Sequence, residues 1–345
     1  MSQYWQDFLN AQGYFNLQAQ TLNALSHQNC LTALTSLGLL SIAGSDAKKF
    51  LQGQVTCNLD DVTLNQSKLG AYCNLKGRMQ SLFRIYRQNN ETQESYYLAL
   101  PQTMLGQTQL VFKKYALFSK VTIEIEQHQV GLGFFGENIT TALQESFPEI
   151  ASLQQPYDYV IKGASKGNVS ITRLPSHYPR YEIWGSPTDM AELWTKHAAN
   201  CHRVLPQAWE LLDIQSGVPT IYPQTSEEVL PHHANLSILN GISYTKGCYL
   251  GQEIIARMQY RGKIKKHLYR AFIQGTQDIP EPGTLVYCKA DAPAEPGLVL
   301  RAAENASENI ELLIVLDDQF NNFENVFLYS ADGPKIHRLD LSYTW

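Results

Sequence analysis

The sequence lacks the marks of a membrane-spanning or exported chain. No apolar run approaches the roughly 18 residues that suggest a membrane span. Neither Lys nor Arg occurs between Met1 and Ala47, whereas a secretory signal needs a basic start and a mitochondrial transit peptide needs arginines. We therefore expect a cytoplasmic protein without a membrane partner.

Clustered cysteines are also missing. The six cysteines are widely scattered and form no Cys-x-x-Cys pair: Cys30, Cys57, Cys73, Cys201, Cys248 and Cys288. A disulfide framework and a local zinc or iron–sulfur site both need ligands at short spacing, so neither is indicated. We predict no stably bound metal, with ligands that converge from distant segments as the alternative.

Phosphate-binding motifs and a strong net charge are absent as well. Neither GxGxxG after a strand nor GxxxxGK[ST] occurs in the chain. The net charge of −5 argues against a protein that coats nucleic acid, although it leaves room for a local basic face. With 345 residues, of which 44% are hydrophobic, the chain is typical of a globular protein of two or three domains.

The patterns that are present predict an α+β protein with mainly antiparallel sheets. The first third is expected to run strand, helix, hairpin, strand, helix, strand, at residues 38–44, 45–54, 70–88, 95–101, 103–118 and 120–127. This order is close to a ferredoxin-like sheet. The next third repeats part of it, with strands at 157–163, 168–175 and 181–186 and helices at 186–199 and 206–219.

Beyond about residue 265 the pattern changes to short strands separated by turns. Such a series is typical of a small antiparallel barrel or sandwich. We therefore predict two interleaved α+β lobes within residues 1–265, approximately 1–130 and 131–265. A small antiparallel β-barrel is expected to follow at residues 266–345.

A single thiol stands out in the stretch KGCYLGQE, residues 246–253, directly ahead of a predicted helix at 253–259. The unpaired N–H groups of a helix start and the amine of Lys246 would both favour the thiolate form of Cys248. Gly247 and Gly251 permit positive φ and close approach to the backbone. Cys248, assisted by Lys246, is therefore the candidate catalytic group, with a small buried core cysteine as the alternative.

Cations gather after this loop. Between residues 246 and 270, Glu253 is the only acidic residue. The candidate basic face consists of Arg261, Lys263, Lys265 and Lys266. Such a face would suit phosphates, the glutamate tail of a folate or an RNA backbone. A solvated loop between domains is the alternative.

Residues 246–253 resemble the K-G-C-Y-x-G-Q-E signature of the YgfZ family, folate-binding relatives of the glycine-cleavage T-protein linked to iron–sulfur protein maintenance and tRNA modification. The matching residues are Lys246, Gly247, Cys248, Tyr249, Gly251, Gln252, Glu253 and Arg257. Segments 41–59, 76–78, 113–123 and 208–219 are similar to the family too. The resemblance implies two ferredoxin-like lobes and a C-terminal barrel that close, ring-like, around a central folate site.

The same resemblance implies tetrahydrofolate or a related folate as cofactor. Trp209 matches a family tryptophan whose ring could contact the pterin, while Gln215 and Leu37 stand where relatives often have Glu and Trp. The T-protein relatives also carry two aspartates after the turn at Gly77, and this chain has Ser81 and Leu82 there. Neither side chain is a carboxylate base, so aminomethyl transfer is not expected.

The function implied is that of a folate-binding accessory protein which supports iron–sulfur cluster synthesis or repair and, through it, tRNA modification. Its expected partners are folate, iron–sulfur proteins or cluster-assembly factors, and tRNA. Two alternatives remain at this point. One is a folate-dependent aminomethyl transferase, and the other is a tRNA- or protein-docking module with a structural folate and a contact face at residues 257–270.

Overall fold

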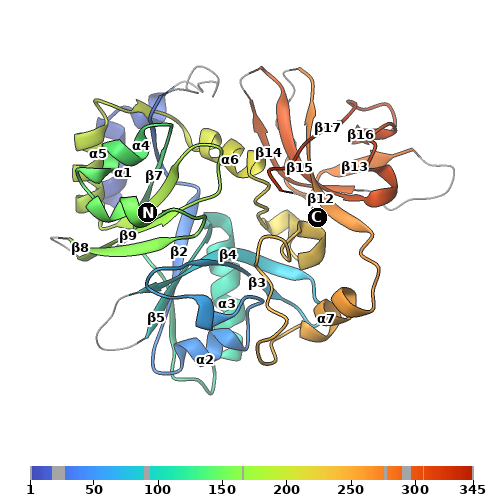
Figure 1. Cartoon of the computed structure of the whole chain (residues 1–345), viewed down its shortest axis with the longest axis horizontal. Helices are drawn as coiled ribbons and strands as arrows, with labels where there is room; N and C mark the ends of the chain where they lie inside the picture. The colour runs from blue at the N-terminus through green and yellow to red at the C-terminus, as the bar shows by residue number, and fades with distance from the viewer. Residues whose placement is uncertain are drawn as a thin grey trace. The chain divides into compact units, whose positions relative to one another are not determined.

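A computed structural model of the chain describes residues 2–17, 28–88, 94–164, 167–275, 278–289, 297–305 and 307–343. It contains three β-sheets with α-helices packed against them (Figure 1). Short 3-10 helices lie at Tyr14–Asn16, Leu59–Asp61, Gln102–Met104, Pro148–Ser152, Pro223–Thr225, Pro231–Ala234 and Asp318–Phe320. The α+β class predicted from the sequence is confirmed. Among the described residues, no helix is long and apolar enough to cross a membrane.

The first sheet has six strands in the order β11-β1-β7-β10-β9-β8. All its pairs are antiparallel except β1 with β11. Its strands are β1 (Cys30–Ala33), β7 (Val130–Phe135), β8 (Tyr159–Ala164), β9 (Gly167–Arg173), β10 (Arg180–Gly185) and β11 (His202–Arg203).

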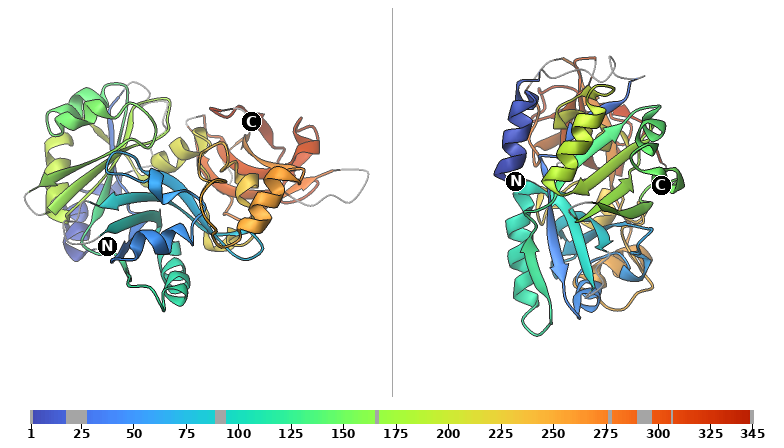
Figure 2. Two further views of the ribbon diagram at one scale, coloured as in Figure 1. Left: turned by 60° about the horizontal axis from the view of Figure 1, so that its bottom comes forward. Right: turned by 90° about the vertical axis from the view of Figure 1, so that its left-hand side faces the viewer.

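Three helices supply apolar side chains to the core on this sheet: α1 (Gln3–Ala11), α4 (Ile139–Gln144) and α5 (Pro187–His197). The helix predicted at residues 186–199 corresponds to α5, and Ser186 caps it, because its hydroxyl accepts a hydrogen bond from the N–H of Asp189. Trp194 of α5 meets Tyr14 edge to face at 5.4 Å between ring centroids. Figure 2 shows α1, dark blue, beside α5, yellow-green.

The second sheet has five strands in the order β3-β4-β5-β2-β6. These are β2 (Leu37–Ala43), β3 (Lys68–Cys73), β4 (Met79–Gln88), β5 (Ser95–Pro101) and β6 (Thr122–Ile125), with helices α2 (Ala47–Gln52) and α3 (Leu105–Tyr115). Phe112 of α3 meets Phe50 and Phe83 edge to face at 6.0 and 6.2 Å. These three rings fix the two helices against the sheet.

The third sheet has six strands in the order β16-β13-β14-β15-β12-β17, all of them beyond residue 265. They are β12 (Lys266–Ile273), β13 (Leu285–Cys288), β14 (Gly297–Glu304), β15 (Ile310–Asp317), β16 (Val326–Leu328) and β17 (His337–Leu339). The register of β14 shifts between Val299 and Arg301, as a β-bulge would shift it.

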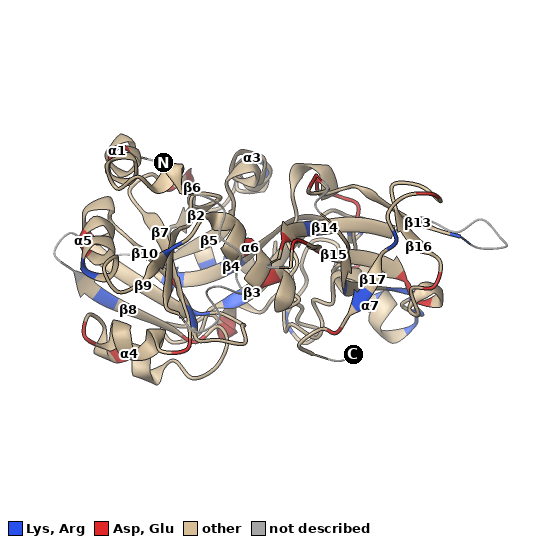
Figure 3. Ribbon diagram, turned by 90° about the horizontal axis from the view of Figure 1, so that it is seen from above, with Lys and Arg blue, Asp and Glu red and all other residues tan. Residues whose placement is uncertain are grey.

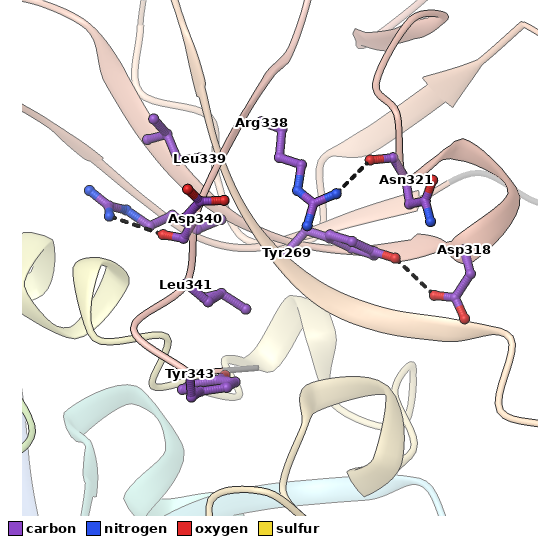
Figure 4. A pocket seen from close by; sticks show the side chains of 9 residues that line it. Tyr269, Asp318, Asn321, Arg338, Leu339, Asp340, Leu341 and Tyr343 are labelled. Atoms are coloured by element: carbon purple, nitrogen blue, oxygen red, sulfur yellow. Dashed lines mark hydrogen bonds between the residues drawn. The ribbon is translucent and has the colours of Figure 1, made fainter. Parts of the chain in front are cut away.

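A cavity of about 380 Å³ lies between this sheet and the chain's last described segment (Figure 4). There the Tyr269 hydroxyl donates to Asp318 at 2.9 Å, and the Arg338 guanidinium lies 5.7 Å from the Tyr269 ring centroid. Arg338 also donates to the backbone oxygen of Asn321 at 3.0 Å, and Tyr343 donates to that of Gly217 at 2.8 Å. These internal bonds hold residues 338–343 in place.

The contacts divide the chain into two compact units that are discontinuous in sequence. The first comprises Met1–Gln52, Asn58–Leu69 and Phe83–Trp209, and the second comprises Gly53–Cys57, Gly70–Leu82 and Glu210–Trp345. In the second unit, buried Arg301 of β14 binds Glu210 and Asp213 of helix α6 (Pro206–Gln215) at 2.6 and 2.8 Å. These two ion pairs fix the part of α6 that belongs to the second unit, residues 210–215, on the third sheet.

Candidate functional site

Two segments singled out in the sequence touch each other in the second unit. They are the turn that joins β3 to β4, residues 74–78, and the start of helix α7 (Gln252–Tyr260). Gly251 has φ of +79°, and a Cβ on it would lie 2.5 Å from the backbone oxygen of Asn74. Gly77 has φ of +72°, and a Cβ on it would lie 3.1 Å from Ile254. Only glycine fits both the conformation and the space at Gly251.

The turn itself is held by a dense set of hydrogen bonds. The side-chain oxygen of Asn74 accepts from the N–H groups of Lys76 and Arg78 at 2.9 and 3.1 Å. The Arg78 guanidinium then donates to the backbone oxygens of Glu227 and Glu228 at 3.3 and 2.7 Å. The turn therefore has a fixed place between α7 and the loop at 227–228.

Cys248 lies on the loop before α7 and its side chain is exposed. The alternative of a buried core cysteine is therefore wrong. Cys248 is four residues ahead of Gln252, the first residue of α7, so it is not part of the helix's first turn. Gly247 does not have positive φ, and no atom lies within 4 Å of where its Cβ would be. Of the two glycines in the motif, the fold requires Gly251.

Lys246 points away from solvent and anchors this loop. Its ammonium donates to the backbone oxygens of Val55 and Cys57 at 2.5 and 2.8 Å, and lies 4.7 Å from the Tyr249 ring centroid. Burial lowers the pKa of Lys246 to about 8. The sequence predicted an amine that activates the thiol, whereas these contacts hold it to the segment at 55–57.

The remaining motif residues shape the start of α7. The side-chain oxygen of Gln252 accepts a hydrogen bond from the backbone N–H of Tyr249 at 3.4 Å. The backbone N–H of Gln252 donates to the backbone oxygen of Tyr249 at 3.2 Å. Glu253 and Arg257 form an exposed ion pair at 2.9 Å, one helical turn apart. Exposed ion pairs of this kind contribute about 0.3–0.5 kcal/mol to the free energy of unfolding, so this pair adds little to the stability of the fold.

The predicted basic face follows α7. Arg261, Lys263 and Lys265 are exposed, and Lys266 is half-buried at the first position of β12. These residues follow α7, whose own basic residue is Arg257, and Figure 3 shows Lys and Arg in blue close to the α7 label. These cations belong to the same unit as Cys248.

The three residues suggested for folate have different surroundings. In the first unit, Leu37 lines a cavity of about 310 Å³ together with Trp184, whereas Trp209 is buried against Gly133 and Phe135. Gln215 belongs to the second unit, where its amide donates to Glu311 at 3.4 Å.

The Trp209 ring is already partly covered. The Arg180 guanidinium lies 3.7 Å from the Trp209 ring centroid, so it occupies a place where a pterin would stack. The buried indole N–H of Trp209 has no hydrogen-bond partner among the described residues.

Sequence reasoning missed a buried carboxylate in the first unit. Glu182 on β10 is fully buried and is bound by Arg84, by the hydroxyl of Tyr86 and, at 2.9 Å, by the indole N–H of Trp184. Burial and the nearby Glu182 carboxylate raise the pKa of Tyr86 well above its ordinary value. A glutamate inside a strand that also holds Arg180 and Trp184 was the available signal.

Sequence reasoning also left a pair of histidines without a role. His232 and His233 lie in the 3-10 helix Pro231–Ala234 of the second unit. Burial, with nearby cationic groups, lowers the pKa of each to about 4. For His233 these groups include Lys266 and Arg78.

The two histidines should make the protein sensitive to mild acid. The unfolded chain binds their protons near pH 6.5 and the folded chain only near 4, so the free energy of unfolding should fall as the pH falls from about 6.5 to 4. Urea denaturation at steps across this range measures it. A variant with His232→Gln and His233→Gln should show a shallower decline, and an equally steep decline would contradict the assignment.

Replacing Gly251 by Ala should loosen the contact between the turn and α7. The substitution places a side chain at positive φ against a backbone oxygen, so we expect a loss of at least about 1 kcal/mol in the free energy of unfolding. Gly247→Ala is the matched control, because that position is open. Equal stability of the two variants would show that the contact at Gly251 does not constrain the fold.

Comparison with known proteins agrees with the motif. The chain is 33% identical to the tRNA-modifying protein YgfZ of Colwellia psychrerythraea over 239 residues, which is 69% of this chain and 70% of that protein. It is 34% identical to the protein of the same name from Yersinia pestis, over 69% of each chain. No profile of a known protein family matches the chain.

A solved structure supports the fold. The glycine cleavage system aminomethyltransferase T of Bartonella henselae superposes with a TM-score of 0.71 at 14% identity, over 92% of this chain and 86% of that one. The expected T-protein-like architecture is therefore confirmed, and at this identity the likeness concerns the fold alone. The sequence identity to the curated relatives shows that the chain belongs to the YgfZ family.

Proposed function

We propose that the protein is a folate-binding accessory protein that supports iron–sulfur cluster synthesis or repair and, through it, tRNA modification. The relatives at 33–34% identity are named tRNA-modifying proteins. The observation that carries the proposal is the exposed thiol of Cys248, presented on a loop whose two ends are anchored. Lys246 fixes one end to residues 55 and 57, and Gly251 fixes the other to the turn at 74.

An exposed thiol held in this way is suited to chemistry with a partner. Iron–sulfur clusters are generally held by several cysteines, so Cys248 alone is not sufficient. In the part of the chain that the structure describes, no group of three or more His, Cys, Asp or Glu side chains is placed to hold a metal ion. Cys248 would therefore share a cluster with a partner protein, or exchange a disulfide with it.

Folate would bind in the first unit, where Trp209 supplies a buried indole N–H that lacks a partner among the described residues. Leaving such a donor unsatisfied costs free energy, so a ligand with an acceptor atom there would bind favourably. The heterocycle of a folate carries such acceptors. When bound, a folate could carry one-carbon units, while this chain's residues would bind and orient it.

The alternative of an aminomethyl transferase finds little support in the site. Ser81 and Leu82, which stand in place of the T-protein aspartates, are both buried and neither can act as a carboxylate base. The Ser81 hydroxyl has no hydrogen-bond partner among the described residues. A shared fold does not restore the missing carboxylates.

Replacing Cys248 by Ser should abolish the cellular function and leave the fold intact. The test is complementation of a bacterium that lacks its own YgfZ, with thiolated nucleosides of tRNA measured by mass spectrometry. We expect the Cys248→Ser variant to give the level of the empty vector. Cys288→Ser, a change at a cysteine that is only partly accessible, should restore the modification. Full restoration by Cys248→Ser would remove the thiol from the proposed mechanism.

Replacing Trp209 by Phe should weaken the binding of tetrahydrofolate, because it deletes the indole N–H and keeps an aromatic ring. One neutral hydrogen bond contributes about 0.5–1.5 kcal/mol, so we expect roughly a two- to tenfold loss of affinity by calorimetry. Trp194→Phe is the matched control, since Trp194 is also buried with an N–H that lacks a partner among the described residues. If the wild-type protein does not bind tetrahydrofolate, the folate part of the proposal fails.

A further inference from the structure

A second cavity, of about 420 Å³, lies within the second unit beside the turn at 74–78. Its volume is within the usual range for ligand pockets. Its lining comes from the turn, the loop before Pro231, helix α7 and four strands of the third sheet. None of the residues assigned above to folate or to the thiol lines this cavity.

The polar part of the lining is predominantly cationic. Lys76, Arg78 and Lys266 line the cavity, and Glu228 is the single carboxylate among its described lining residues. Arg78 donates to the backbone oxygens at 227 and 228, which holds its guanidinium in place. His233 also lines the cavity, and its lowered pKa of about 4 keeps the imidazole neutral, able to accept or donate a hydrogen bond.

The rest of the lining is apolar. Leu230, Ile254, Leu285 and Leu298 contribute to it, and Leu285 is 53% exposed. An exposed leucine at the edge of a cationic cavity suits a ligand that combines an anionic group with a flat or apolar body. A nucleotide has both parts, since its phosphate is anionic and its base has an apolar face.

The cations continue beyond the cavity. Arg261, Lys263 and Lys265 are exposed on the segment that leads directly into Lys266. One or two cations are sufficient for a small acid, whereas a row of them matches the regular charges of a nucleic-acid backbone. Two nearby acidic side chains are paired with other residues, Glu253 with Arg257 and Asp318 with His267 and Tyr269. Asp317 lies opposite Lys266 in the sheet, and Glu228 lines the cavity. The charge pattern therefore favours a polyanion over a free acid.

We propose that this cavity holds one nucleotide of an RNA strand, with its phosphate on Lys76 and Lys266 and its base against the leucines, while the strand continues along residues 261–265. The inference rests on the proposed role in tRNA modification and gives that role a binding site. The apolar floor adds affinity for an unpaired base, so single-stranded parts of a tRNA are the expected ligand.

The test measures binding of bulk bacterial tRNA to the full-length protein at several salt concentrations. A variant with Lys76→Glu and Lys266→Glu removes two phosphate contacts, so the slope of log K against log salt should become shallower by about 1.4, with roughly 25-fold weaker binding at 0.1 M salt. Lys113→Glu with Lys114→Glu, exposed lysines of α3 in the first unit, makes the same charge change elsewhere and should leave the slope unaltered.

A second variant tests the base contact. Leu285→Ser should weaken tRNA binding at every salt concentration without changing the slope, because it removes apolar contact and no charge. Thermal unfolding of each variant confirms that the fold is retained. An unchanged slope in the Lys76 and Lys266 variant overturns the proposal. The proposal is also overturned if millimolar inorganic phosphate abolishes tRNA binding by the wild type and by that variant to the same extent.

The outcomes separate this inference from the proposed function. Loss of tRNA modification in the Cys248→Ser variant, together with normal tRNA binding by the Lys76 and Lys266 variant, would overturn the cavity's role and leave the proposed function standing. Full modification in the Cys248→Ser variant, together with weaker tRNA binding by the Lys76 and Lys266 variant, would overturn the proposed role of the thiol and leave the cavity's role standing.

Discussion

The approach of the Gly251 backbone to the oxygen of Asn74 is the constraint on which the candidate site depends. A side chain at Gly251 would overlap that oxygen, and the left-handed backbone there would be strained. Because of this contact, helix α7 begins directly against the turn that joins β3 and β4. One segment belongs to the motif that contains Cys248 and the other is the turn with Lys76, Gly77 and Arg78, so residues almost 180 positions apart in the sequence lie in contact.

The buried amine of Lys246 complements this contact on the other side of the loop. Desolvation makes the charged form of a buried lysine costly, and the lowered pKa reflects that cost. Two backbone oxygens and the face of Tyr249 offset it. Between these two anchors the backbone carries Gly247 and Cys248 outward, so the thiol is exposed while its neighbours are fixed.

The fold and the chemistry of the chain give different indications of function. The architecture is that of the aminomethyltransferase T, yet Ser81 and Leu82 replace the carboxylates expected of a transferase. A fold of this kind accommodates different functions when its site residues change. The exposed thiol of Cys248 and the cationic residues within 261–266 of the second unit both suit interactions with macromolecular partners.

The sequence alone determined the class of the fold, the positions of elements such as strand β6 and helix α5, and the motif that contains Cys248. These features follow from local preferences and periodicity, which a short window of residues displays. Only the tertiary structure decided that Lys246 faces residues 55 and 57, that Arg180 covers Trp209, and that Glu182 is buried among polar partners. Each of these features depends on a contact between segments far apart in the chain. The burial of a side chain and the residues that it contacts are set by tertiary packing, which a local sequence pattern does not contain.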